Sequence, residues 1–151
     1  MRCHPLLFRI AEDDEAALPL ERTVARLARE YVVGGVDGEA LLGVGGLTRY
    51  EGVKLRHRAL LWGMYVHESA RGRGLADAIV EALVAEARVS EIEQVVLTII
   101  AGNQRAIRLY ERWGCRQYGL EPRAVKVGRE YLDEILMVLA AGQEPRASGG
   151  R

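Results

Sequence analysis

Apolar residues recur every three or four positions in three segments of the chain, a spacing that places them on one face of an α-helix. The first segment covers residues 20–30 and follows Pro19, a residue that suits the start of a helix. The second segment, residues 75–87, follows a glycine-rich turn. The third begins near Gln104 and ends at Gly114, because glycine commonly stops a helix. We therefore expect three helices.

Strand-like runs of apolar residues occupy most of the remaining chain. Two such runs flank Asp37-Gly38, a dipeptide that readily adopts the positive φ values of a tight hairpin turn. Gly63 interrupts another run, which predicts a β-bulge at that position. In two places the order is strand, glycine turn and helix. The strands are expected over residues 1–10, 31–36, 40–50, 59–66, 94–100, 115–127 and 130–139.

The composition fits one compact domain. The chain has 151 residues, of which 49% are hydrophobic and 28% charged, a balance that supports a buried core and is atypical of disordered chains. We expect the domain to span residues 1–141, followed by a flexible polar tail over residues 142–151. The 21 basic and 21 acidic residues cancel, so the overall charge does not favour nucleic acid or an acidic membrane as a partner. Any anion site must therefore be local.

The sequence also gives expectations for compartment and metal content. No apolar run approaches the length of a membrane span or of a signal-peptide core. The two cysteines, Cys3 and Cys115, lie far apart in the sequence, which fits neither a zinc site nor a small disulfide framework. We expect a soluble cytoplasmic protein with reduced thiols, and with no bound metal, nucleic-acid partner or membrane association.

The segment Arg71-Gly72-Arg73-Gly74-Leu75-Ala76 joins a predicted strand to a predicted helix and is a candidate anion site. Glycines leave backbone N–H groups uncovered, and the following helix adds its own unpaired N–H groups and the positive end of its dipole. Arg71 and Arg73 add positive charge, although a plain structural turn explains the same glycines. A dinucleotide-binding motif would need glycine where this chain has Asp77, and a triphosphate-binding loop would need a Gly-Lys pair, which the sequence lacks.

Two motifs about 30 residues apart carry the most specific signal. The first is formed by Arg71, Gly74 and Ala76, and the second by Asn103, Ala106, Leu109, Tyr110 and Gly114. Together they resemble two signatures of the GNAT superfamily of N-acetyltransferases, Arg/Gln-x-x-Gly-x-Gly/Ala and Asn-x-x-Ala-x-x-Leu-Tyr-x-x-x-Gly. The resemblance covers nearly the whole chain. It implies a single α/β (α+β) domain with a mixed, mostly antiparallel sheet flanked by helices.

The resemblance also implies acetyl-CoA as the cosubstrate, with pantetheine lying between a strand that carries residues 64–66 and a strand that carries residues 97–100. A backbone N–H near Met64 or Tyr65 would hold the oxyanion. Tyr110 would meet the sulfur and donate a proton to the leaving thiolate. The cofactor-binding residues that it implies are Met64, Tyr65, Val66, Arg71, Gly72, Arg73, Gly74, Leu75, Ala76, Asn103 and Ala106.

Simpler structural roles fit some of the same residues. Tyr110 also suits a core position between helix and sheet, and Asn103 is a good N-cap for the helix that starts at Gln104. Cys115 raises the idea of a covalent acetyl carrier, but no histidine is placed beside it by a motif. We therefore expect a structural role for Cys115.

Two positions depart from the family pattern. Many relatives carry glutamate five residues before the motif asparagine, where this chain has Thr98, so the resemblance does not identify the general base. Asp77 stands where relatives often have a basic residue or glycine, so contact with the 3′-phosphate of the cofactor is expected from Arg105 or Arg108. Two alternatives to a side-chain base are equally open. A chain of water molecules removes the proton, or the amine arrives already neutral. The side chains that qualify as a base, each of which also fits an ordinary surface residue, are Glu51, His57, His67, Glu68 and Glu134.

These features favour one function over two alternatives. We expect an enzyme that transfers acetyl from acetyl-CoA to a primary amine of a small molecule or peptide by direct attack. The acceptor is expected among the first helices, the loop of residues 51–58 and the last hairpin near Arg129, and homodimers are common among similar proteins. A non-catalytic module of the same fold that binds or senses acyl-CoA is the main alternative, favoured by Thr98, whereas Tyr110 favours the enzyme. A dinucleotide oxidoreductase is the third class.

Overall fold

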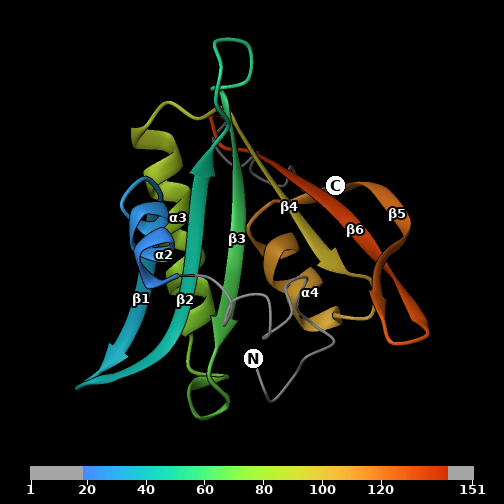
Figure 1. The fold of residues 1–151 in the computed structure, drawn as a ribbon, viewed down its shortest axis with the longest axis horizontal. Coiled ribbons are helices and arrows are strands. Elements are labelled where there is room, and N and C mark those ends of the chain that lie inside the picture. Colours follow the sequence, from blue (N-terminus) through green and yellow to red (C-terminus); the bar gives the residue numbers. More distant parts are fainter. Residues whose placement is uncertain (1–18, 143–151) are drawn as a thin grey trace, which may run out of the picture.

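The computed structural model describes residues 19–142, in which six strands form one sheet with helices on both faces (Figure 1). The helices are α2 (Leu20–Leu27), the short 3-10 helix η2 (Glu68–Ala70), α3 (Leu75–Val89) and α4 (Gln104–Arg112). The strands are β1 (Tyr31–Asp37), β2 (Ala40–Arg49), β3 (Arg58–Val66), β4 (Gln94–Ile100), β5 (Arg116–Val127) and β6 (Glu130–Ala140). The strand expected over residues 1–10 and the tail beyond Gly142 lie outside the described residues.

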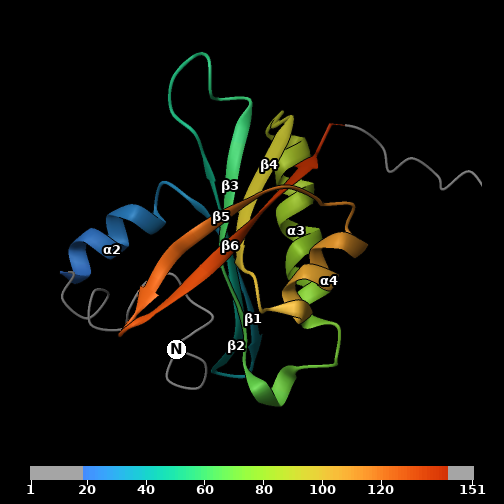
Figure 2. The ribbon, with the colours of Figure 1, turned by 90° about the vertical axis from the view of Figure 1, so that its right-hand side faces the viewer.

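The strand order is β1-β2-β3-β4-β6-β5, and all neighbouring strands are antiparallel except β3 and β4, which are parallel. This arrangement confirms the mixed, mostly antiparallel sheet. α3 and α4 cover one face, and α2 lies on the other (Figure 2). Within the described part of the chain, no helix combines the length and the apolar character that a membrane crossing requires.

The hydrophobic core lies between the sheet and the two helices α3 and α4. Side chains project alternately to the two faces of a strand, so every second residue of β4 and β6 points into this core. From α3, five side chains are buried, whereas no side chain of α2 is buried. The central part of the core consists of Ile79, Val80, Leu83, Val84, Val95, Leu97, Ile99, Ile135, Met137 and Leu139.

Most expected elements are confirmed to within a residue or two, and two boundaries differ. The first hairpin turns at residues 38–39 rather than at Asp37-Gly38, because Asp37 still pairs with Ala40. α2 ends at Leu27 instead of near Glu30. Because α2 buries no side chain, tertiary packing adds little to extend it, and short helices depend on such packing.

Glycines in β2 allow α3 to lie close to the sheet. A β-carbon added at Gly43 would lie 2.9 Å from Cδ1 of Ile79, and one added at Gly45 would lie 2.8 Å from Cγ2 of the same residue. Both distances are too short for ordinary contact between carbon atoms. The glycine-rich sequence of β2 therefore sets the distance between α3 and the sheet.

We predict that Gly45→Ala destabilises the protein by about 1–3 kcal/mol, the usual cost of overpacking a core. The added methyl group would meet both Ile79 and Leu83. The free energy of unfolding measured with urea checks this prediction. Gly102→Ala is the matched control, because nothing lies within 4 Å of its β-carbon position. Equal stability of the two variants would contradict the close approach of α3.

Candidate active site

β3 and β4 are paired only where both strands begin. The parallel register consists of three pairs, Arg58 with Gln94, Ala59 with Val95 and Leu60 with Val96. Beyond these pairs β3 is paired only with β2, and β4 only with β6. The expected parting of the two strands is confirmed, and Figure 1 shows them diverging. The two facing edges carry backbone N–H and C=O groups that an extended, amide-containing ligand can pair with.

A bulge lies in β3 where the strands part. Val44 pairs with Tyr65 and Gly46 pairs with Trp62, so two residues of β3, Gly63 and Met64, stand opposite Gly45 alone. The bulge expected at Gly63 is therefore confirmed, and the φ of Gly63 is 66°. A bulge disturbs the ladder of hydrogen bonds and re-aims nearby groups. The backbone of Met64 and Tyr65 is the part of β3 that it affects.

The glycine turn follows directly after β3 and η2. Gly72 and Gly74 have φ values of 73° and 82°, a region that residues with a β-carbon rarely adopt. Arg71 connects the turn to the end of β3, because its Nε donates a hydrogen bond of 3.1 Å to the carbonyl oxygen of Val66. The sequence did not predict η2, which begins at a histidine cap where Nδ1 of His67 accepts a hydrogen bond from the backbone of Ser69.

The start of α3 completes a site suited to an anion. The first hydrogen bond within α3 runs from Ala78 N to the carbonyl oxygen of Gly74, 3.0 Å. The N–H groups of residues 75–77 precede that bond and so point out of the helix end, where the helix dipole is positive. Arg73 is exposed beside them, and open space surrounds the β-carbon positions of both glycines of the turn. These donors fit the oxygens of a diphosphate.

α4 lies beside α3 on the same face of the sheet, where β3 and β4 part (Figures 1 and 2). Asn103 caps this helix as expected, because its Oδ1 accepts a hydrogen bond of 3.2 Å from Ala106 N. Tyr110 is 4% exposed and belongs to the core cluster. Burial raises its pKa above the ordinary value, and the nearby Cys115 raises it further. The phenol is therefore neutral at physiological pH and can donate a hydrogen bond.

Asp77 joins the two helices that carry the motifs. Its carboxylate accepts two hydrogen bonds from Nη2 of Arg112, at 3.0 and 3.2 Å, and one of 3.0 Å from Nε1 of Trp113. The first turn of α3 is thus bound to the end of α4. The sequence showed Asp77 only as a departure from the family pattern, and its partners 35 and 36 residues later gave no signal. Arg105 and Arg108 are exposed on α4.

The residues considered as a general base lie in three different places. Glu51 and His57 precede β3, at the end of the sheet where β3 and β4 are paired, away from the parting. His67 and Glu68 are exposed at η2. Glu134 is buried, with 1% of its surface exposed, so the interpretation of this residue as an ordinary surface residue is wrong. Its strand, β6, lies between β4 and β5, so Glu134 is not at an edge of the sheet.

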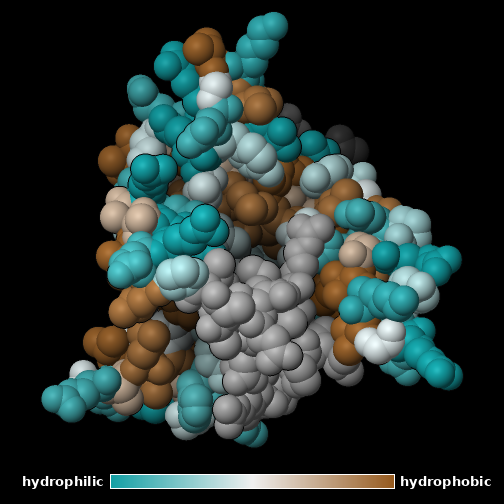
Figure 3. Space-filling view, viewed as in Figure 1, coloured by the Kyte–Doolittle hydropathy of each residue, from teal (hydrophilic) through white to brown (hydrophobic). Residues whose placement is uncertain are grey.

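An apolar hollow is visible on the face that carries α2. Figure 3 shows apolar side chains at its floor, between the part of the surface formed by β2 and β3 and the part formed by β5 and β6. α2 and the β5–β6 hairpin project to this same side of the sheet, opposite α3 and α4 (Figure 2). The hollow therefore lies on the face opposite α3 and α4, on the same side as α2 and the β5–β6 hairpin.

Comparison with known proteins gives a consistent result. The sequence model of the acetyltransferase (GNAT) family matches residues 2–115. L-2,4-diaminobutyric acid acetyltransferase of Vibrio cholerae is 32% identical over 69 residues. That segment spans 46% of this chain and only 40% of the relative.

Solved structures share the fold. Ribosomal-protein-alanine N-acetyltransferase from Brucella melitensis has a TM-score of 0.74 at 22% identity, over 84% of this chain and 82% of that chain. A putative acetyltransferase from Salmonella typhimurium, solved with its cofactor acetyl-CoA, has a TM-score of 0.75 at 19% identity, over 97% of this chain and 86% of that chain. At these identities the likeness establishes the architecture.

We predict that Cys115 reacts slowly with a thiol reagent in the folded protein. Burial raises the pKa of its thiol to about 11, so very little reactive thiolate exists at pH 8. In a Cys3→Ser variant, modification by dithiobis(nitrobenzoic acid) at pH 8 should be at least about a hundredfold slower in the native state than in urea. The native rate should rise as the pH approaches 11, and similar rates in both states would contradict the burial of Cys115.

Proposed function

The chain belongs to the acetyltransferase (GNAT) family, and we propose that it transfers acetyl from acetyl-CoA to a primary amine by direct attack. The observation that carries this proposal is the parting of β3 and β4 next to the glycine turn. The parting offers backbone groups to pantetheine, and the turn offers donors to the diphosphate. A solved protein of the same fold contains acetyl-CoA, which supports the same cosubstrate here.

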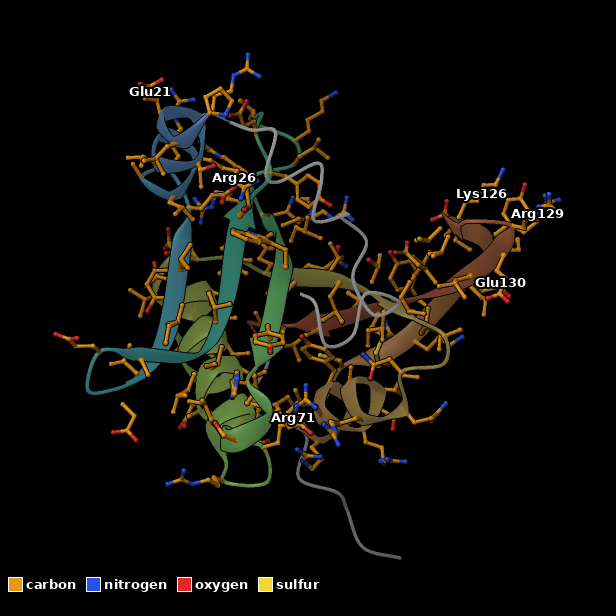
Figure 4. The ribbon with its side chains drawn as sticks, turned by 60° about the horizontal axis from the view of Figure 1, so that its bottom comes forward. Glu21, Arg26, Arg71, Lys126, Arg129 and Glu130 are labelled. Carbon is orange, nitrogen blue, oxygen red and sulfur yellow. The ribbon has the colours of Figure 1, made fainter. Side chains whose placement is uncertain are left out.

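The proposed arrangement uses residues of three elements. The N–H groups of Gly72 to Ala76, with Arg71 and Arg73, would hold the diphosphate. The edge of β3 at Met64, Tyr65 and Val66 would pair with the pantetheine arm, and α4 would border that arm at Asn103 and Ala106. Figure 4 shows Arg71 at the turn that leads into α3, which places this charge at the end of the parted strands.

The chemistry follows from the charges that develop during transfer. Acetyl-CoA supplies an acetyl group activated as a thioester. When an amine attacks, a backbone N–H of the bulged segment near Met64 or Tyr65 would hold the developing oxyanion. Tyr110 would donate a hydrogen bond to the departing sulfur. Because burial raises its pKa above that of an ordinary tyrosine, full proton transfer to a thiolate costs more than about 2 kcal/mol. Stabilisation by the hydrogen bond is therefore the main contribution.

The acceptor would approach from the face that carries α2. Arg26 on this helix lies over the ring of Trp62, with its guanidinium carbon 5.5 Å from the ring centroid. Lys126 and Arg129 mark the β5–β6 hairpin on the other side of this face (Figure 4). The relatives named above are acetyltransferases of the amino acid L-2,4-diaminobutyric acid and of alanine in a ribosomal protein, so both kinds of amine belong in a test panel.

A non-catalytic acyl-CoA-binding module is the second candidate function. Thr98 favours it, because this position on β4 holds no group that can accept a proton. Release of free thiol from acetyl-CoA in the presence of an amine panel separates the two candidates. Release with at least one amine supports the enzyme, whereas tight binding of coenzyme A without release supports the module.

We predict that Tyr110→Phe lowers kcat about a hundredfold with the best amine of that panel, because the departing sulfur loses its hydrogen-bond donor. The affinity for acetyl-CoA should change little, since the ring is retained in the core. Steady-state thiol release and calorimetry measure the two quantities. An unchanged kcat in the folded variant would remove Tyr110 from the mechanism.

We further predict that Arg73→Glu weakens binding of coenzyme A by about tenfold at low salt, equivalent to about 1.4 kcal/mol. The substitution reverses an exposed charge beside the proposed diphosphate site. Arg22→Glu is the matched control, because Arg22 is exposed on α2, on the opposite face of the sheet. Calorimetry at two salt concentrations checks both variants, and equal affinities would place the diphosphate elsewhere.

A further inference from the structure

Glu134 is the only charged side chain that is buried among residues 19–142. Fully buried carboxylates are rare in proteins and are held by specific interactions. The position of Glu134 is rigid, because β6 is paired on both sides. Glu134 stands opposite Ile100 on β4 and opposite Glu121 on β5. The preceding residue, Asp133, is also held, since its Oδ1 accepts a hydrogen bond of 2.8 Å from Arg123 N.

The side chain of Glu134 projects to the face of the sheet that carries α2. Leu97, Ile99, Ile135 and Met137 belong to the core under α3 and α4. Because neighbouring residues of a strand point to opposite faces, Glu134 points away from that core. Its partner Ile100 and the nearby Thr98 on β4 share the same face.

β3 presents two aromatic side chains on this same face. Gly45 of β2 faces Ile79 of α3, so the flanking positions on β2 face the other way. Trp62 is paired with Gly46 and Tyr65 with Val44, which places both rings on the face of α2. The cation–π contact between Arg26 of α2 and Trp62 agrees with this placement.

Glu134 also lies level with the proposed reaction centre. Leu60 and Val96 form the last pair between β3 and β4. Four residues further along each strand are Met64 and Ile100, and Ile100 is the residue opposite Glu134. Residues opposite each other in an antiparallel pair have β-carbons about 4.5–5.5 Å apart. The carboxylate of Glu134 is therefore one strand away from the open edge, at the height of the bulge.

The neighbours of Glu134 in the sheet leave it as the proton acceptor of this region. β4 contributes Thr98 and Ile100, neither of which titrates. β5 contributes Glu121, which is exposed, and β3 contributes Tyr65 across the parting. The candidates before β3 lie at the paired end of the sheet, and His67 and Glu68 are exposed at η2, beyond the end of β3.

We infer that Glu134 binds the ammonium group of the acceptor and takes the proton that the amine must lose. This inference rests on the proposed function. The ammonium gives one proton to Glu134, and the nitrogen lone pair then forms the C–N bond to the thioester carbon. The C–S bond breaks with its electron pair on sulfur, the nitrogen loses its second proton, and the thiolate gains one proton. Glu134 finally releases its proton to water, so the balance is one proton per acetyl transferred.

The test compares Glu134→Gln with the natural chain, using acetyl-CoA and the best amine of the panel. The variant should lose at least about a hundredfold in kcat/KM at pH 7 while its affinity for coenzyme A is unchanged. The natural enzyme should show a nearly flat profile between neutral pH and the pKa of the amine. In the variant, kcat/KM should rise about tenfold per pH unit over that range, because only the neutral amine can react.

Glu121→Gln is the matched control, because Glu121 is the exposed glutamate that pairs with Glu134 on the neighbouring strand. The kcat/KM of this variant should stay within about twofold of that of the natural chain. Thr98→Glu in the Glu134→Gln background should restore part of the rate, because position 98 lies diagonally across the same pair of strands. If Glu134→Gln does not fold, Glu134→Asp replaces it, and the shortened carboxylate should lower kcat/KM about tenfold at pH 7.

A loss in Glu134→Gln that is the same at every pH would overturn the inference, as would full activity of either variant at Glu134. These outcomes leave the proposed function intact, because the natural chain still releases thiol. If the natural chain releases no thiol with any amine, the proposed function fails and this inference fails with it. Thiol release by the natural chain therefore distinguishes failure of this inference from failure of the proposed function.

Discussion

The early end of the pairing between β3 and β4 is the feature on which the rest of the structure depends. Two parallel strands that stop pairing after three residues leave main-chain donors and acceptors along both facing edges. Such groups are costly to bury without partners. A ligand that supplies alternating amide groups can restore the missing ladder, and pantetheine has that chemistry. The parting therefore weakens the sheet locally, and it is where the proposed cosubstrate would lie.

The surrounding elements hold that parting in one shape. The glycines of β2 bring α3 close to the sheet, and Asp77 fastens the first turn of α3 to the end of α4. The turn that would hold the diphosphate and the helix that carries Tyr110 are thus parts of one unit. A ligand bound at the turn would have its far end positioned with respect to the phenol by this connection. Such prior positioning of reacting groups accounts for a large part of catalysis in general.

The two faces of the sheet carry different parts of the proposed site. The face under α3 and α4 holds the apolar core, the glycine turn and Tyr110. The face under α2 holds Trp62, Tyr65 and Glu134, and the described basic residues of the last hairpin project on that side. An acceptor and a cosubstrate that enter from different faces meet only where the strands part. In this proposal, the carboxylate on β6 and the phenol on α4 would act on opposite sides of the reacting bond.

The sequence by itself determined the order of strands and helices, the bulge at Gly63, the cap at Asn103 and the glycine turn, because each depends on periodicity or on the chemistry of one short segment. It could not reveal that Asp77 binds Arg112 and Trp113, nor that Glu134 is buried level with the bulge. In sequence, Glu134 follows Asp133 near the start of an expected strand and resembles any surface glutamate. Only the placement of β6 next to β4 brings it within one strand of the parting, because pairing between strands distant in sequence is decided by the whole sheet.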